Sequence, residues 1–70
     1  MPLVTIHLFP GRTASQKQAV VRGVTDVLVR EANTLPEHVE VILIEVPKEH
    51  WAIGGNLPEP AATNAGPLPV

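Results

Sequence analysis

Apolar and polar positions divide this chain into two strand-like runs separated by one helical segment. In residues 3–9 both sets of alternating positions carry apolar side chains, so we expect a strand with both faces covered. Residues 39–46 form an almost continuously apolar run, Val-Glu-Val-Ile-Leu-Ile-Glu-Val, which is typical of a second strand buried on both faces. Between the two runs, valines and leucines recur at helical spacing, which predicts an amphipathic helix.

The helical segment has sequence signals at both ends. Thr13-Ala14-Ser15-Gln16 fits a capping box, in which a hydroxyl is followed three residues later by Gln. The helix is therefore predicted from about Ala14 to Asn33, before Pro36. A strand, a long helix and a second strand form a βαβ unit, so we expect an α/β (or α+β) fold with parallel strands and a right-handed crossover.

Two features follow the second strand. Gly54-Gly55 is a turn signal, which predicts a short hairpin or arm. The final residues are rich in proline and have neither a helical nor a strand period, so we expect an extended tail. The predicted organisation is a folded domain over residues 1–57 and a Pro-rich tail over residues 58–70.

Size and composition predict a homo-oligomer. The hydrophobic core of a chain of 70 residues rarely stabilises the fold by more than about 3–5 kcal/mol. Such a small chain usually needs a disulfide, a bound metal ion or oligomerisation in addition. The sequence has no cysteine, and its three histidines lack metal-ligand spacing. One helix also cannot cover both faces of a two-stranded sheet, so another subunit is expected. The net charge of −2 weighs against nucleic-acid binding, and no apolar run predicts a membrane span or signal peptide, so we expect a cytoplasmic protein.

Pro2 is the candidate catalytic residue. Methionine is usually trimmed before a residue as small as proline, and trimming would leave Pro2 with a free secondary amine. The reference pKa of an α-amino group is about 7.7–8.0, and desolvation or nearby cations lower it. A base near neutral pH suits proton transfer at carbon. In the alternative interpretation Pro2 only begins an edge strand, where its missing N–H costs nothing.

Arg12 is the candidate anion-binding residue. It follows the carboxyl end of the first predicted strand and precedes a helix N-terminus, a position that favours anionic ligands. The alternative is a solvated loop residue. The first strand separates Pro2 from Arg12 by more than about 20 Å. If both residues act on one small substrate, the site must therefore be shared between subunits.

The chain resembles the short 4-oxalocrotonate tautomerases of the tautomerase superfamily from Pro2 to about Leu57. The matching features are Met-Pro at the start, Phe9-Pro10-Gly11-Arg12-Thr13, Gln16-Lys17, Glu45-Val46-Pro47 and Trp51-Ala52-Ile53-Gly54-Gly55. The resemblance implies βαβ subunits, dimers with a four-stranded sheet, and usually a hexamer of three dimers. It also implies a tautomerase that needs no cofactor, in which Pro2 moves a proton between carbons of a conjugated 2-hydroxy or 2-oxo acid.

The resemblance further implies roles for residues around Pro2. Arg12 would bind a substrate carboxylate, Phe9 belongs to the substrate-binding motif, and Trp51 would help to form an apolar wall beside the proline. Glu40 departs from the family pattern, which has a second arginine at this position. A carboxylate there would repel a developing oxyanion and raise the pKa of the amine. Glu40 is therefore either a substrate-binding residue that orients water or a polar group, or a solvated strand residue.

Other functions use the same residues. Pro2 with Glu40 would suit the addition of water to an unsaturated acid, as in a hydratase or dehalogenase, and the amine would also suit imine formation. A non-catalytic oligomeric binding module is a further alternative. Trp51 would equally suit packing against a neighbouring subunit. His7, His38 and His50 are expected to be structural or surface residues.

Overall fold

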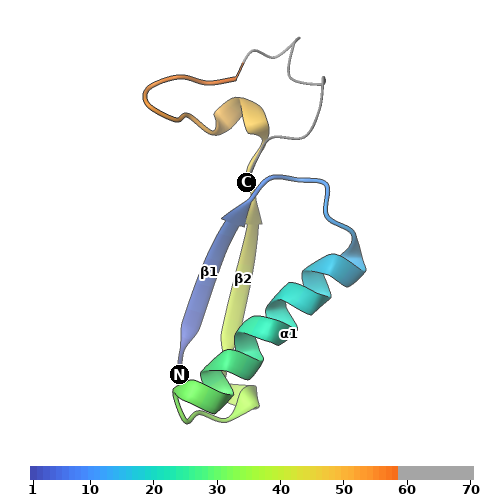
Figure 1. The fold of residues 1–70 in the computed structure, drawn as a ribbon, viewed down its shortest axis with the longest axis vertical. Coiled ribbons are helices and arrows are strands. Elements are labelled where there is room, and N and C mark those ends of the chain that lie inside the picture. The colour runs from blue at the N-terminus through green and yellow to red at the C-terminus, as the bar shows by residue number, and fades with distance from the viewer. Residues whose placement is uncertain (59–70) are drawn as a thin grey trace.

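The computed structural model describes residues 1–58 and contains one βαβ unit with two short 3₁₀ turns (Figure 1). The elements are β1 (Leu3–Leu8), α1 (Ala14–Glu31), η1 (Pro36–His38), β2 (Glu40–Glu45) and η2 (Lys48–His50). The two strands are parallel, as predicted, and each element ends within two residues of its predicted bounds. The predicted tail over residues 58–70 lies outside the described residues, except for Pro58.

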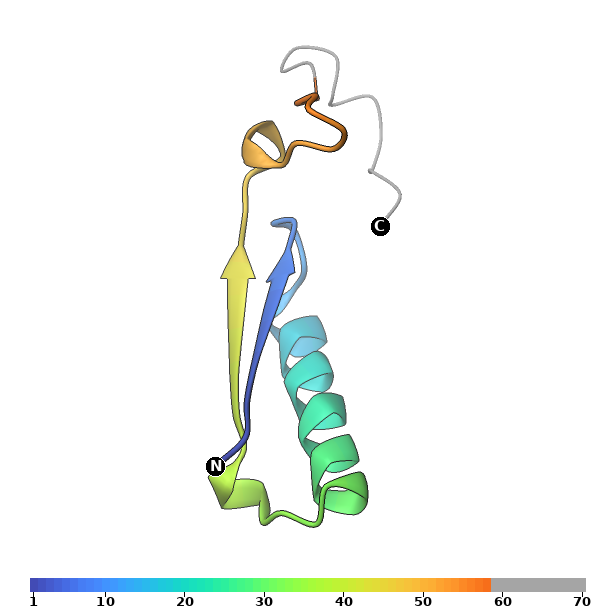
Figure 2. The ribbon, with the colours of Figure 1, turned by 90° about the vertical axis from the view of Figure 1, so that its left-hand side faces the viewer.

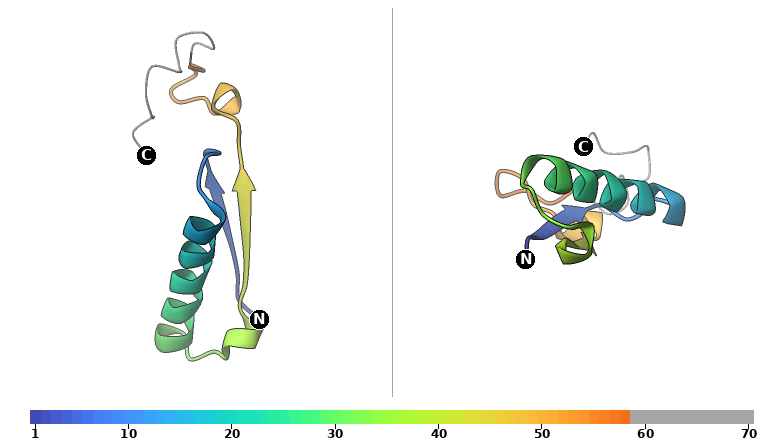
Figure 3. Two further views of the ribbon diagram at one scale, coloured as in Figure 1. Left: turned by 90° about the vertical axis from the view of Figure 1, so that its right-hand side faces the viewer. Right: turned by 90° about the horizontal axis from the view of Figure 1, so that it is seen from below.

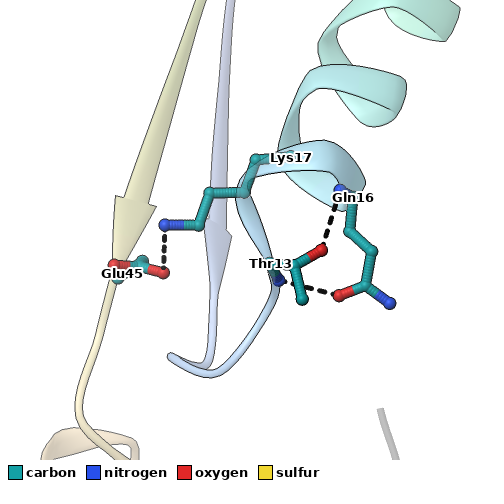
Figure 4. Close-up of polar contacts among 4 residues, drawn as sticks. All are labelled: Thr13, Gln16, Lys17 and Glu45. Atoms are coloured by element: carbon teal, nitrogen blue, oxygen red, sulfur yellow. Dashed lines mark hydrogen bonds and ion pairs between the residues drawn. The ribbon is translucent and has the colours of Figure 1, made fainter.

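Helix α1 begins and ends at the signals that the sequence carries. The Thr13 hydroxyl accepts the Gln16 amide at 3.1 Å, and the Gln16 side chain accepts the Thr13 amide at 2.8 Å, which confirms the capping box (Figure 4). At the other end the Ala32 amide donates to the Leu28 carbonyl at 2.9 Å. Asn33 then takes a left-handed φ of 55°, which ends the helix.

The protomer has two layers, because α1 packs on one face of the sheet only (Figures 2 and 3). The covered face presents half-buried apolar side chains, among them Ile6 of β1 and Leu43 of β2. The opposite face leaves Leu3 at 56% exposure, Ile42 at 48% and Ile44 at 38%. A single chain therefore covers one of the two faces that the sequence predicts to be covered.

The interior of one protomer is small. Among residues 1–58, Phe9 is the only buried hydrophobic residue, at 8% exposure. The outer side of α1 also exposes Val20 and Val27, at 42% and 46%, whereas Val24 and Leu28 are half-buried toward the sheet. The apolar stripe predicted for the helix is thus divided between the sheet and the outer surface.

The segment after β2 forms a turn beyond the ends of both strands (Figure 1). Ile53 and Asn56 exchange backbone hydrogen bonds of 2.9 and 3.1 Å, and Gly54 and Gly55 between them have φ values of 63° and 85°. Two successive left-handed residues suit a tight hairpin turn and favour glycine at both positions. The predicted hairpin is confirmed as a single bridge. Among the described residues, no helix has the length and apolar character that crossing a membrane requires.

Candidate functional site

The candidate site residues fall at two opposite ends of the sheet. Pro2 precedes the first residue of β1, and Glu40 is the first residue of β2. Leu3 and Glu40 are register partners, and the Glu40 amide donates a 2.9 Å hydrogen bond to the Pro2 carbonyl. Pro2 and Glu40 are therefore neighbours within one chain, as parallel strands that start at the same end require.

The end of the sheet that carries Pro2 is open and acidic. Met1 is 83% exposed, so its removal would disrupt little packing. Glu40 lies on the uncovered face of the sheet, in the same alternating set as Ile42 and Ile44, and it is exposed. The short turn η1 leads directly into this end and adds the exposed side chain of Glu37.

The opposite end of the sheet is held together by aromatic packing. Phe9 follows β1, and Trp51 follows η2, so residues from the two halves of the βαβ unit meet there. Their ring centroids lie 4.5 Å apart with planes tilted by 55°. Tilted aromatic pairs of this kind contribute stability beyond the apolar area that they bury. The two aromatic residues that the resemblance assigns to the site are thus in contact.

Arg12 lies at this same end, in the loop that joins β1 to α1. Its side chain is exposed, and the preceding Gly11 has a φ of 120°, a conformation that favours glycine. The capping box at Thr13 holds the residue that follows. In addition, Lys17 of α1 forms a 2.9 Å salt bridge with Glu45 of β2, which ties the first turn of the helix to the end of the sheet (Figure 4). Arg12 is therefore presented to solvent from a loop anchored on both sides.

Two hollows flank Trp51. One, of ≈ 290 Å³, is lined by Trp51 with His7, Val46, His50 and Ala52. The other, of ≈ 210 Å³, is largely apolar and is lined by Phe9, Trp51, Ile53, Asn56, Leu57 and Pro58. Trp51 is thus the residue common to both hollows.

His7 and His50 line a hollow, although the sequence predicts only structural or surface roles for them. Strand alternation places His7 on the uncovered face of β1, and the chain brings His50 to the same end after Pro47. Periodicity alone predicts the first placement but gives no signal for the second. Among residues 1–58, no group of three potential metal-ligating side chains occurs.

Within one chain the structure does not unite the two ends. The six residues of β1 separate Pro2 and Glu40 from Phe9, Arg12 and Trp51. At about 3.3 Å per residue, that strand spans roughly 20 Å, which is longer than a small carboxylic acid. One end offers the position of a terminal amine, and the other offers an arginine beside an apolar surface.

The sequence matches a known family over most of its length. A profile of the Tautomerase enzyme family matches residues 2–61. A 2-hydroxymuconate tautomerase from Pseudomonas fluorescens is 37% identical over 62 residues, which cover 89% of this chain and 94% of that protein. A protein named as a probable tautomerase from Listeria monocytogenes is 42% identical over 55 residues, 79% of this chain and 90% of its own length.

Solved structures give the same result. A 4-oxalocrotonate tautomerase isozyme from Methylibium petroleiphilum superimposes with a TM-score of 0.75 at 41% identity, over 80% of this chain and 90% of that chain. The heterohexamer 4-oxalocrotonate tautomerase of Chloroflexus aurantiacus gives a TM-score of 0.76 at 30% identity, over 81% and 92%. The family profile spans most of the sequence, and these structural matches cover 80% and 81% of the chain. The chain therefore belongs to the tautomerase family and is an isomerase.

Proposed function

We propose that this tautomerase acts without a cofactor, after removal of Met1, with the Pro2 amine as its general base. Its substrate would be an unsaturated or aryl carboxylic acid that carries a 2-hydroxy or 2-oxo group. The observation that carries the proposal is the position of Pro2 at the open end of the sheet, just before β1 and next to the exposed Met1. Removal of Met1 would convert the tertiary amide nitrogen of Pro2, which has no basicity, into a secondary amine.

The proposed reaction is an internal proton transfer. The amine takes the proton from the 2-hydroxyl oxygen of the enol, the C2–O bond becomes a carbonyl, and the double bonds shift along the conjugated chain. The same proton is then delivered to carbon, so that atoms and electrons balance without any co-reactant. A base positioned in this way typically contributes about 10²–10⁴-fold to the rate.

The substrate carboxylate is proposed to bind Arg12. A guanidinium pairs with a carboxylate through two parallel hydrogen bonds, which gives both energy and orientation. Phe9 and Trp51 would offer an apolar surface for the conjugated part of the substrate beside that anchor. Their contact at 4.5 Å supports a wall that is already formed in the protomer.

We further propose that the protein is a homo-oligomer, most simply a hexamer built as three dimers, with shared active sites. The roughly 20 Å between Pro2 and Arg12 in one chain means that they meet on one small molecule only if they come from different copies. The apolar side chains exposed on the sheet at Leu3, Ile42 and Ile44 support burial against another copy. The related protein from Chloroflexus aurantiacus is named a heterohexamer.

Intact mass spectrometry and one substitution test the proposal. We expect the purified protein to lack Met1, and Pro2→Ala to lower kcat/KM by about 10²–10⁴-fold on a 2-hydroxydienoate. The matched control is Gln18→Ala, an exposed residue of α1, which should retain activity. Full activity in protein that retains Met1, in which the Pro2 nitrogen is an amide, would show that Pro2 is not the base.

A further inference from the structure

We infer that Glu40 is a specificity-determining residue that selects substrates with a single carboxylate. That carboxylate would bind Arg12 of a neighbouring copy, and the uncharged end of the substrate would lie beside Glu40. The inference rests on the proposed function, because it takes Pro2 as the centre of the active site.

The position of Glu40 relative to Pro2 is set within one chain. The hydrogen bond from the Glu40 amide to the Pro2 carbonyl is 2.9 Å long, and neighbouring strands lie about 4.8 Å apart. Both residues sit where their strands begin, so no change of assembly would separate them. Any site that forms around the Pro2 amine therefore lies beside the backbone of Glu40, whose exposed side chain projects from the uncovered face of the sheet.

The charges around this end of the sheet are mostly negative. Glu37 of η1 and Glu40 of β2 are both exposed there, with His38 between them in sequence. The cationic residue in the last turn of α1, Arg30, lies at the same end but forms a 2.9 Å ion pair with Glu31. Arg12, Lys17 and Lys48 all lie at or beyond the other end of the strands. The protomer thus separates its carboxylates near Pro2 from the arginine proposed to bind substrate.

This charge separation distinguishes between two classes of substrate. A monocarboxylate brings its anion to Arg12 and leaves a neutral alkenyl or aryl group next to Glu40. A dicarboxylate brings a second anion toward Glu40, where like charges in a partly dehydrated site repel each other. Glu40 should also favour the protonated form of a nearby amine and raise its pKa.

The test compares two enol acids that differ in one carboxylate, 2-hydroxymuconate and 2-hydroxypenta-2,4-dienoate. The parent protein should have the higher kcat/KM on the monocarboxylate. In Glu40→Gln, which keeps the shape of the side chain and removes its charge, the ratio of dicarboxylate to monocarboxylate kcat/KM should rise about tenfold. Glu40→Arg should raise that ratio further. Glu37→Gln, which removes a carboxylate from the adjacent turn, is the matched control and should change the ratio much less than Glu40→Gln does.

A pH profile supplies an independent readout. Loss of the Glu40 carboxylate should lower the apparent pKa of the rising limb of kcat/KM for both substrates, because the protonated amine loses a stabilising neighbour. An unchanged ratio in Glu40→Gln, an equal change in Glu37→Gln, or a parent that prefers the dicarboxylate would overturn the inference. Protein that retains Met1 is measured in parallel: if it keeps full activity on both acids, the proposed base is wrong, whatever the substrate ratio shows.

Discussion

The two ends of the sheet are built in different ways. At the end with Phe9 and Trp51, side chains from separate elements pack on each other, and Lys17 pairs with Glu45 across the helix–sheet boundary. At the end with Pro2, the principal link is a backbone hydrogen bond from Glu40, and the surrounding side chains are exposed. The Phe9–Trp51 end is packed within the protomer. The Pro2 end has a defined backbone, but its surrounding side chains do not enclose it.

This difference indicates what assembly has to supply. Dehydration lowers the pKa of an amine toward neutral pH, and the open end of one chain does not provide it. The aromatic end offers an apolar surface and an arginine but has no base. If the Pro2 end of one copy packed against the Phe9–Trp51 end of another, the amine would gain an apolar environment, and the arginine would gain a base.

Among substitutions at the end with Phe9 and Trp51, removal of the Arg12 charge should have the largest effect on activity. Arg12→Ala should lower kcat/KM for a carboxylate substrate by roughly 10- to 150-fold, because a charge-assisted hydrogen bond is worth about 1.5–3 kcal/mol. Steady-state kinetics on processed protein measure the change. Arg22→Ala, an exposed position on α1, is the control for loss of a positive charge. Equal activity in the two variants would show that Arg12 is a bystander.

The next effect concerns the packing that forms this end before assembly. Trp51→Leu keeps an apolar side chain but removes the ring contact with Phe9, so the free energy of unfolding should fall by about 0.5–1.5 kcal/mol beyond the loss of buried area. Trp51→Phe keeps an aromatic ring and should lose less. Denaturant unfolding followed by circular dichroism, at a fixed protomer concentration, measures both. If Trp51→Phe is destabilised as much as Trp51→Leu, the ring contact contributes no specific stability.

The smallest effect belongs to the Lys17–Glu45 salt bridge. Both side chains are more than a third exposed, so we expect a coupling energy of only about 0.2–1 kcal/mol. A double-mutant cycle with Lys17→Met and Glu45→Gln measures the coupling through unfolding free energies. The coupling should weaken at high salt, because screening acts strongly on exposed charges. A large coupling that salt does not change would mean that the pair is buried by a neighbouring subunit.

The sequence predicts the βαβ unit well because its signals are local. Apolar positions on both faces defined β1, a continuous apolar run defined β2, and Thr13 with Gln16 located the start of α1 to the residue. The helix ends two residues before its predicted bound, and Asn33 beyond it adopts a left-handed conformation that periodicity does not encode.

The candidate site was predictable only in part. Strand length alone indicates that Pro2 and Arg12 lie far apart, and parallel strands bring Glu40 beside Pro2. In contrast, the contact of Phe9 with Trp51 depends on how the chain turns after β2, and the hollow at His7 and His50 depends on the same turn. Such contacts join residues distant in sequence, so no local pattern specifies them.

In the proposed assembly, one active site takes Pro2 from one copy and Arg12 from another. Subunit complementation tests it directly: the Pro2→Ala and Arg12→Ala variants are purified, dissociated, mixed in equal amounts and reassembled. Random assembly should make about a quarter of the sites intact, because those sites take both native residues from different chains. Activity near a quarter of the parent's is the predicted result. A mixture no more active than the average of the two variants alone, in oligomers shown by native mass spectrometry to be mixed, would contradict the shared site.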